Sequence, residues 1–294
     1  MRFAVSIPNF GPGLGAALVG DWAAEAEAGG WDGFFLWDHL LAFDPGAIDV
    51  VDAWMALAVA ATRTSRVRLG TMVTPLPRRR PVKLAREVTT LDRLSGGRAV
   101  LGVGIGAMPF EWDYLGEESD LRRRGQMLDE HLELLERIWS GEPVDHAGEH
   151  YRASGGPSAS TWKGVFHPTP VRGGRVPVWV AGTWPGTRPF RRAARWDGVV
   201  PMRVDGAWEV DDTRAVVAYI ERHRGREVGR DGAFAVVVAG ETDPADAARR
   251  ERFAAHEAAG ATWWVEGVHP WRYGWKAGDP LPEARMRGRL QAGP

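Results

Sequence analysis

Trp37, Asp38 and His39 are the residues of this chain best placed to do chemistry. They stand at the end of an apolar run, Gly33 to Trp37, that has the composition of a buried strand. A carboxylate accepts hydrogen bonds from a polar ring system, and an imidazole with a pKa near ~6.5 exchanges a proton at neutral pH. The pair therefore predicts acid–base chemistry on a bound ligand. An Asp that caps a helix, beside a half-buried His, is the structural alternative.

A second informative stretch runs from Leu91 to Gly106 and joins a helix end, a turn and a strand without spare residues. Ser95-Gly96-Gly97 supplies the left-handed conformations that end a helix. In and after the apolar run that follows, Gly104 and Gly106 stand where a side chain would block a flat ligand. A strand that loses its side chains at this end predicts space for such a ligand.

The elements that must position these residues alternate along the chain. Short, mostly continuous apolar runs predict strands covered on both faces at 3–7, 33–37, 67–73, 99–105, 176–181, 198–202, 234–239 and 262–266. Helical spacing predicts helices at 18–28, 51–62, 82–94, 121–139, 187–195, 212–224, 246–259 and 283–290. This alternation predicts an α/β fold, a (β/α)8 TIM barrel, in preference to a doubly wound open sheet. Residues that end barrel strands face the active-site mouth, which is where Asp38 and His39 are expected.

The 294 residues fit one barrel domain, 1–294, with a single insertion. From 148 to 177, between the fourth helix and the fifth strand, the sequence is rich in Gly, Pro and Ser and has no sustained period. Long loops in compact domains often have a function, so this segment is expected to be either a surface excursion or a substrate lid.

Composition excludes several classes of protein. The net charge of -1 and the lack of a basic block argue against nucleic acid as a partner, and no apolar stretch reaches the ~18 residues of a membrane span. The sequence has no cysteine and opens on a predicted strand, which indicates a cytoplasmic protein without disulfides. No His-x-His pair or HExxH motif suggests a metal site. Few lysines beside many arginines, with abundant Ala and Gly, indicate a high-GC bacterial source.

Tryptophan is unusually frequent, with 15 residues. Most are expected in the core. Trp271, Tyr273 and Trp275, however, follow the last predicted strand beside His269. Because aromatic rings stack on planar molecules, we expect at least one of them to line an apolar or aromatic substrate pocket.

The order of these motifs resembles the bacterial luciferase-like family of flavin- and deazaflavin-dependent oxidoreductases and monooxygenases. The resemblance covers almost the whole chain. It rests on Trp37-Asp38-His39, Leu69-Gly70-Thr71 with Arg80-Pro81, Asp92 to Arg98 followed by Leu101 to Gly106, Ile138 to Gly141 with Tyr151, Pro177 to Gly182, and Ala193 to Gly198.

Members of this family bind FMN or coenzyme F420 at the carboxyl end of the barrel. The resemblance implies that a bulge at the end of the third strand, built from Thr71, Met72 and Val73, lies against the cofactor ring. Such bulges commonly contain a non-proline cis peptide bond, here Met72-Val73 or Thr71-Met72. The resemblance also implies that Asp38 contacts the ring and that His39 lies at the reaction centre.

The cofactor phosphate is expected on Ala181, Gly182 and Thr183, where the fifth strand turns into a helix. Backbone N–H groups at a helix start are unpaired and carry the positive end of the helix dipole. Gly182 would let the chain approach the phosphate closely. A βα turn without a ligand is the structural alternative.

The two cofactors imply different reactions, because F420 moves a hydride to or from carbon, whereas reduced FMN reacts with O2 and oxygenates a substrate. The Asp-His pair and the compositional bias favour F420, while Ala107 stands where some F420-dependent members have a glutamate. The sequence therefore predicts F420-dependent hydride transfer on a small organic substrate, with FMN-dependent oxygenation as the alternative and a homodimer allowed. A non-catalytic flavin-binding barrel and a hydrolase barrel with His39 as base also stay open.

Overall fold

The structure of the chain is a computed structural model that describes residues 1–42, 48–153, 164–225 and 234–294. The chain divides into two compact units. The first comprises Met1–Val73, Val100–Val103 and Pro177–Pro294, and the second comprises Thr74–Ala99 and Gly104–Val176. The single domain expected over 1–294 stays a prediction.

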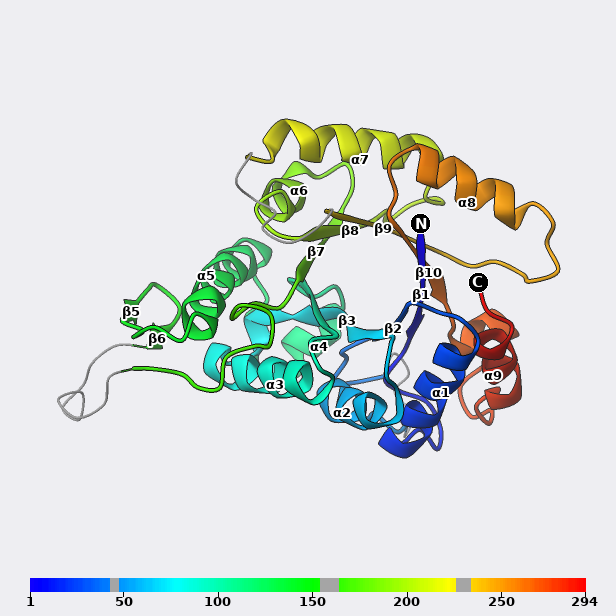
Figure 1. The fold of residues 1–294 in the computed structure, drawn as a ribbon, viewed down its shortest axis with the longest axis horizontal. Coiled ribbons are helices and arrows are strands. Elements are labelled where there is room, and N and C mark those ends of the chain that lie inside the picture. Colours follow the sequence, from blue (N-terminus) through cyan, green and yellow to red (C-terminus); the bar gives the residue numbers. More distant parts are fainter. Residues whose placement is uncertain (43–47, 154–163, 226–233) are drawn as a thin grey trace. The chain divides into compact units, whose positions relative to one another are not determined.

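The strands of the main sheet close into a barrel (Figure 1). They are β1 (Arg2–Ile7), β2 (Gly33–Leu36), β3 (Arg68–Pro75), β4 (Ala99–Gly104), β7 (Val178–Thr183), β8 (Gly198–Met202), β9 (Ala235–Gly240) and β10 (Trp263–Gly267). Each strand follows its predecessor around the barrel, and β1 pairs in parallel with both β2 and β10. This closure confirms the predicted (β/α)8 barrel, since an open sheet would leave β1 or another strand with a free edge.

The longer helices lie where the apolar periodicity predicts them, with ends that differ by up to three residues. They are α1 (Ala16–Ala28), α2 (Ala53–Arg63), α3 (Pro81–Leu94), α5 (Leu121–Trp139), α6 (Thr187–Ala193), α7 (Val210–His223), α8 (Arg249–Ala258) and α9 (Glu283–Gln291). The short helix α4 (Pro109–Asp113) and the 3-10 turns η1 (Leu76–Arg78) and η2 (Pro270–Tyr273) have no counterpart in the prediction. Elements of one turn contain too few residues to establish a period.

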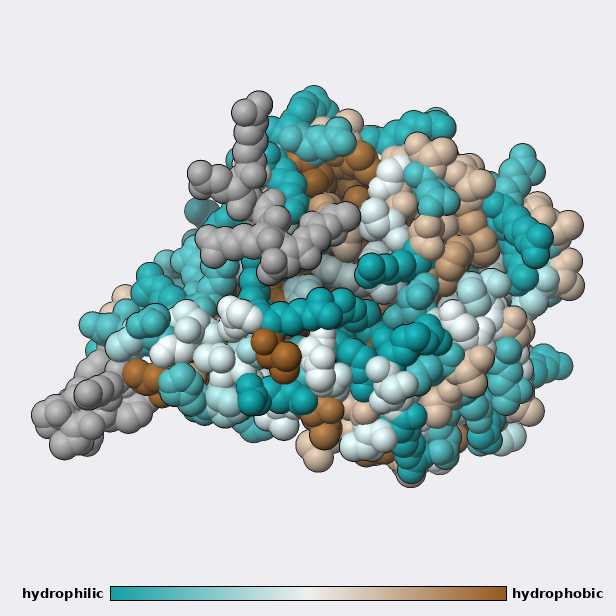
Figure 2. All heavy atoms as spheres, viewed as in Figure 1, coloured by the Kyte–Doolittle hydropathy of each residue, from teal (hydrophilic) through white to brown (hydrophobic). Residues whose placement is uncertain are grey.

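Polar side chains are spread over the described parts of the face drawn in Figure 2, as expected where helices meet water on one side. None of the helices within the described ranges is long and apolar enough to cross a membrane.

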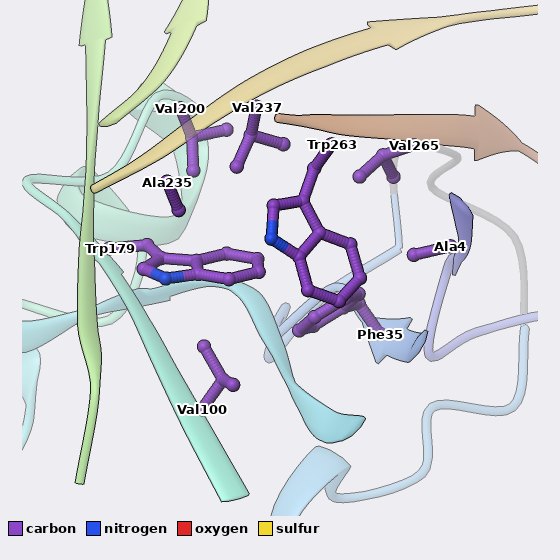
Figure 3. Close-up of a cluster of buried hydrophobic side chains, with 9 residues drawn as sticks. All are labelled: Ala4, Phe35, Val100, Trp179, Val200, Ala235, Val237, Trp263 and Val265. Atoms are coloured by element: carbon purple, nitrogen blue, oxygen red, sulfur yellow. The ribbon is translucent and has the colours of Figure 1, made fainter. Parts of the chain in front are cut away.

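Aromatic side chains fill the interior of the barrel (Figure 3). The ring centroids of Trp179 and Trp263 are 5.2 Å apart, and Phe35 lies 5.3 Å from Trp179. Because protein interiors are close-packed, the positions beside these rings hold very small residues. A Cβ atom on Gly198 would lie 2.7 Å from Trp179 and 2.7 Å from Ala235. The glycine that begins β8 is therefore required by the size of the neighbouring tryptophan.

The second unit contains η1, α3, α4 and α5 and a small antiparallel hairpin of β5 (His146–Ala147) and β6 (Arg152–Ala153). The hairpin lies partly in the segment expected at 148–177, which was predicted to have no regular structure. The excursion between α5 and β7 thus begins earlier than the sequence suggests. Residues 154–163 lie outside the described residues, so the choice between a surface excursion and a lid stays open.

A buried ion cluster holds the last helix against the barrel. Glu266, near the end of β10, is fully buried and its Oε1 lies 2.6 Å from Nη1 of Arg272 and 3.3 Å from Nε of Arg289. Thr242 donates to the same carboxylate from its backbone N–H at 2.7 Å and from its hydroxyl at 2.9 Å. Burial by itself raises the pKa of Glu266, but Arg289, Thr242, Trp264 and Arg272 together lower it below its usual value.

We expect Gly198→Ala to destabilise the protein by about 1–3 kcal/mol, the usual cost of extra atoms in a packed core. Gly288→Ala is the matched control, because Gly288 lies inside α9 and a Cβ there meets nothing within 4 Å. Alanine favours a helix over glycine by about 1 kcal/mol, so the control should be neutral or stabilising. Urea unfolding measures both, and equal stability of the two variants would contradict the packing argument.

Replacing Glu266 by Gln should destabilise the protein by about 3–5 kcal/mol near neutral pH, because two buried guanidinium groups lose their counter-charge. The lowered pKa means that the folded state binds the proton less readily than the unfolded chain does. The stabilisation is therefore complete above the ordinary carboxyl pKa of about 4.3 and is lost as pH falls toward the lower folded value. The free energies of unfolding of the wild type and of E266Q should consequently converge as the pH is lowered through this range. The control D211N removes an exposed ion pair with Arg214 and should change little at any pH.

Candidate functional site

Asp38 and His39 follow β2 after the single residue Trp37, at the carboxyl end of the barrel. Asp38 is only 3% exposed, and His39 is half-buried. The helix-cap alternative for Asp38 is wrong, because the N-cap of α2 is Asp52, whose side chain accepts a hydrogen bond from the backbone N–H of Met55. Asp38 therefore lies buried at the end of the barrel where TIM-barrel sites are found, without being a helix cap.

The backbone of His39 is held by a residue of another loop. Asn9, fully buried after β1, donates from Nδ2 to the carbonyl of His39 at 2.9 Å and accepts from the N–H of His39 at 3.0 Å through Oδ1. Its Nδ2 also donates to the carbonyl of Val51 at 2.8 Å. Sequence reasoning missed Asn9, because contacts of an isolated polar residue with positions 30 and 42 residues away leave no local pattern.

Aromatic rings surround His39. The imidazole packs edge-on against Phe10 at 5.8 Å and against Trp37 at 5.9 Å. Trp271 lies 5.7 Å from Phe10 and 6.3 Å from Trp37, with its plane within 19° of the Trp37 plane. We call Phe10, Trp37, His39 and Trp271 the aromatic cluster. Trp271 thus lies in one cluster with His39, and its expected place in a substrate pocket stays a prediction.

The loop that carries Trp271 is fixed from both sides. Nδ1 of His269 accepts from the backbone N–H of Arg272 at 3.2 Å, so the ring proton is on Nε2 and bonds Glu241 at 2.8 Å. The guanidinium of Arg272 donates to the carbonyl of Gly267 at 2.7 Å besides its pair with Glu266. These contacts position the indole of Trp271 before any ligand arrives.

The non-proline cis peptide bond expected on β3 is present: Met72-Val73 is cis, the first of the two possibilities specified. The bulge itself stays a prediction. Leu36 of β2 pairs with Thr71, so Met72 and Val73 lie level with the residues that follow β2. The hydroxyl of Thr71 is buried and donates to the carbonyl of Gly102 at 3.2 Å, which leaves its side chain committed to the sheet. Met72 packs on the barrel core.

Ala181, Gly182 and Thr183 end β7, so they belong to the strand and not to the turn, which comprises 184–186. Ala181 packs on the same core as Met72, and Thr183 is exposed. A Cβ on Gly182 would lie 2.3 Å from the Cβ of Pro189 in α6. Packing of the helix on the strand therefore accounts for this glycine, whether or not a phosphate lies nearby.

Gly104 and Gly106 were singled out for the space they leave. Gly104 is the buried last residue of β4. Gly106 has φ +81° and a Cβ there would lie 2.1 Å from the Trp112 ring. The backbone around it is further held by Arg124, which donates to the carbonyls of Ile105 and Gly106 at 3.1 and 3.3 Å. The left-handed turn and the Trp112 ring explain Gly106 without a ligand.

Two buried titratable groups inside the second unit, His131 and Tyr151, are not suited to proton transfer near neutral pH. Burial lowers the pKa of His131 to about 3, against a weaker opposing hydrogen bond with the backbone of Leu76. Burial also raises the pKa of Tyr151, and the Glu130 charge adds to that effect. Arg78 pairs with Glu111 at 2.9 Å, and the guanidinium of Arg124 lies 4.1 Å from the ring centroid of Trp112. Tyr151, part of the motif pattern, therefore packs against His131 as a structural residue.

Among the side chains that the structure describes, no group of three or more His, Cys, Asp or Glu residues is arranged to hold a metal ion. Asp38 and His39 lie in the first unit, in which Glu241 and His269 are bonded to each other.

Comparison with known proteins places this fold in a family. The model of the luciferase-like monooxygenases matches residues 1–289. The F420-dependent glucose-6-phosphate dehydrogenase of Nocardia farcinica (strain IFM 10152) is 34% identical over 263 residues, which is 86% of this chain and 72% of that protein. The oxygenase component of the flavin-dependent trigonelline monooxygenase of Acinetobacter baylyi is 31% identical over 137 residues, 47% of this chain and 36% of that protein.

Solved structures show the same fold. An F420-dependent secondary alcohol dehydrogenase in complex with an F420-acetone adduct superposes with a TM-score of 0.73 at 17% identity, covering 92% of this chain and 94% of that one. The closed barrel, the cis bond in β3 and the family match over almost the full length agree with one another. The chain belongs to the luciferase-like monooxygenase family of oxidoreductases.

Proposed function

We propose that this protein is an F420-dependent oxidoreductase that transfers a hydride to or from a small organic substrate. The observation that carries the proposal is the buried Asp38 beside His39 at the barrel end, in a chain 34% identical to an F420-dependent dehydrogenase. F420 supplies the hydride chemistry when bound, and the protein supplies binding, orientation and proton transfer.

The residues at the barrel end fit a flat cofactor ring. Met72 and Ala181 pack on the core and make an apolar floor, and the register of β2 with β3 sets Val73 near the level of Asp38. Asp38 would accept a hydrogen bond from a polar group of the ring. His39 holds or releases the proton that accompanies hydride transfer.

The phosphate end of the cofactor is proposed to lie at Ala181, Gly182 and Thr183. Thr183 offers an exposed hydroxyl at the end of β7. Gly186, the N-cap of α6, makes no side-chain cap bond, and the first N–H groups of a helix have no partner within the helix itself. Gly104 and Gly106 stay proposed neighbours of the cofactor.

The substrate is proposed to be apolar or aromatic. The aromatic cluster flanks His39, and planar rings favour stacked or edge-on contact with one another. Arg272, the cation of the adjoining loop, is already engaged with Glu266 and Gly267 and does not serve a phosphate. We therefore propose a substrate other than the sugar phosphate named for the Nocardia relative. A bacterial, cytoplasmic protein is proposed on the cysteine-free composition and the bacterial relatives.

An FMN-dependent monooxygenase is the second candidate, favoured by Ala107 and by the similarity to the trigonelline monooxygenase component. Titration of the purified protein with F420 and with FMN, each oxidised and reduced, separates the two. We expect tight binding of F420, followed by its reduction with a phenyl-substituted secondary alcohol but not with glucose-6-phosphate. Preference for FMN, with oxygen consumption on adding reduced FMN, would overturn the F420 assignment, and binding of neither cofactor would favour the hydrolase alternative.

His39→Ala should lower turnover roughly 10²- to 10⁴-fold, the range typical of acid–base groups, with little change in cofactor affinity. Asp38→Ala should act in the opposite order and weaken cofactor binding first, because its carboxylate is proposed as a hydrogen-bond acceptor. Binding by fluorescence titration and rate by F420 absorbance are measured separately for each variant. Full activity of H39A would show that the imidazole is part of the scaffold.

A further inference from the structure

We propose that Asn9 is the positioning residue of the site: its buried side-chain amide takes the place of a peptide group beyond the end of the β1–β2 ladder and fixes where His39 stands. The inference rests on the proposed role of His39. It assigns a task to a residue that does not itself touch the reacting atoms.

The pairing of β1 with β2 ends just before His39. The last ladder bond between β1 and β2 runs from the N–H of Trp37 to the carbonyl of Ile7 at 2.9 Å. Beyond it, the backbone of His39 needs one acceptor and one donor. The amide of Asn9 supplies both, with bonds of 3.0 and 2.9 Å to the same residue. Two bonds to one peptide residue fix its orientation as well as its distance.

Only an amide of this length meets all the requirements. Nδ2 faces two carbonyl oxygens, those of His39 and Val51, so this position must donate twice. A carboxylate would set a negative oxygen against both carbonyls, and a hydroxyl has a single hydrogen to donate. The backbone of Asn9 is itself fixed, because its carbonyl accepts from the N–H of Val51 at 2.9 Å.

The next residue completes the arrangement. Phe10 packs edge-on against the imidazole of His39, and it forms an antiparallel bridge with Val50. Adjacent residues of one loop thus hold the backbone of His39 through Asn9 and its ring through Phe10. A group held in this way keeps its position before the cofactor binds, and a displacement of about 1 Å costs on the order of 10²-fold in rate.

The test compares Asn9→Ala with Asp49→Ala. Asp49 ties the same loop to the same neighbour by accepting from the N–H of Gly13 at 2.7 Å, but it makes no contact of that kind with His39. The ring protons of His39, assigned by their loss in H39Q, experience the ring currents of Phe10 and Trp37 and report the position of the imidazole in NMR spectra of the whole protein. We expect N9A to change this ring-current shift and D49A to preserve it.

A second readout uses turnover of the phenyl-substituted secondary alcohol with F420. N9A should lower kcat about 10²-fold at unchanged F420 affinity, and D49A should leave kcat as it is. If N9A does not fold, N9D replaces it, because the aspartate keeps the volume of the side chain and the acceptor for the N–H of His39. The lowered kcat of N9D should rise again at acidic pH, where the introduced carboxyl is protonated and can donate a hydrogen bond.

The outcomes separate the two proposals. An unchanged His39 ring-current shift in N9A, or an equal change in N9A and D49A, overturns the positioning role of Asn9 even if H39A is inactive. Full activity of H39A overturns the proposed function, while the NMR comparison still decides whether Asn9 positions His39.

Discussion

The contact between Trp179 and Trp263 at the centre of the barrel is the constraint on which the other features of the first unit depend. A closed barrel must fill its own interior, because a void forfeits dispersion contacts on every wall. Two indoles and the ring of Phe35 fill this one, and the strands beside them therefore hold glycine and alanine at inward positions. Met72 and Ala181 pack on the same cluster, so the apolar wall of the proposed cofactor site is continuous with the core.

Where the ladders stop, polar side chains take over the pairing of the backbone. Asp32 accepts from the N–H of Phe3 at 2.9 Å and Asp197 from that of Val178 at 2.9 Å, next to the starts of β1 and β7. At the opposite ends of the strands, the side chain of Asn9 bonds the backbone of His39, and the carboxylate of Glu266 accepts from the backbone N–H of Thr242. Buried backbone groups must be paired, and a strand end is where the sheet can no longer do it. Residues that solve this problem at the carboxyl end of the barrel also fix the backbone of the proposed catalytic residue His39.

Glycine positions show why a functional interpretation of a sequence needs the packing beside it. Gly182 and Gly106 are consistent with space for a ligand when the chain is read alone. In the fold, a side chain at either position would collide with Pro189 or with Trp112. A missing side chain indicates that something approaches closely, and only the three-dimensional structure shows whether that is the protein itself.

The sequence by itself determined the barrel, the sites of its strands and helices, the placement of Asp38 and His39 after β2 and the cis bond in β3, because these follow from local periodicity and from a motif order that a whole family shares. Tertiary structure alone decided the role of Asn9, the stacking of Trp271 beside Trp37, and the ion cluster of Glu266 with Arg272 and Arg289. Each of these joins residues of different loops or elements. Such contacts depend on how the barrel closes, since closure brings β10 back to β1, and no window of neighbouring residues contains that information.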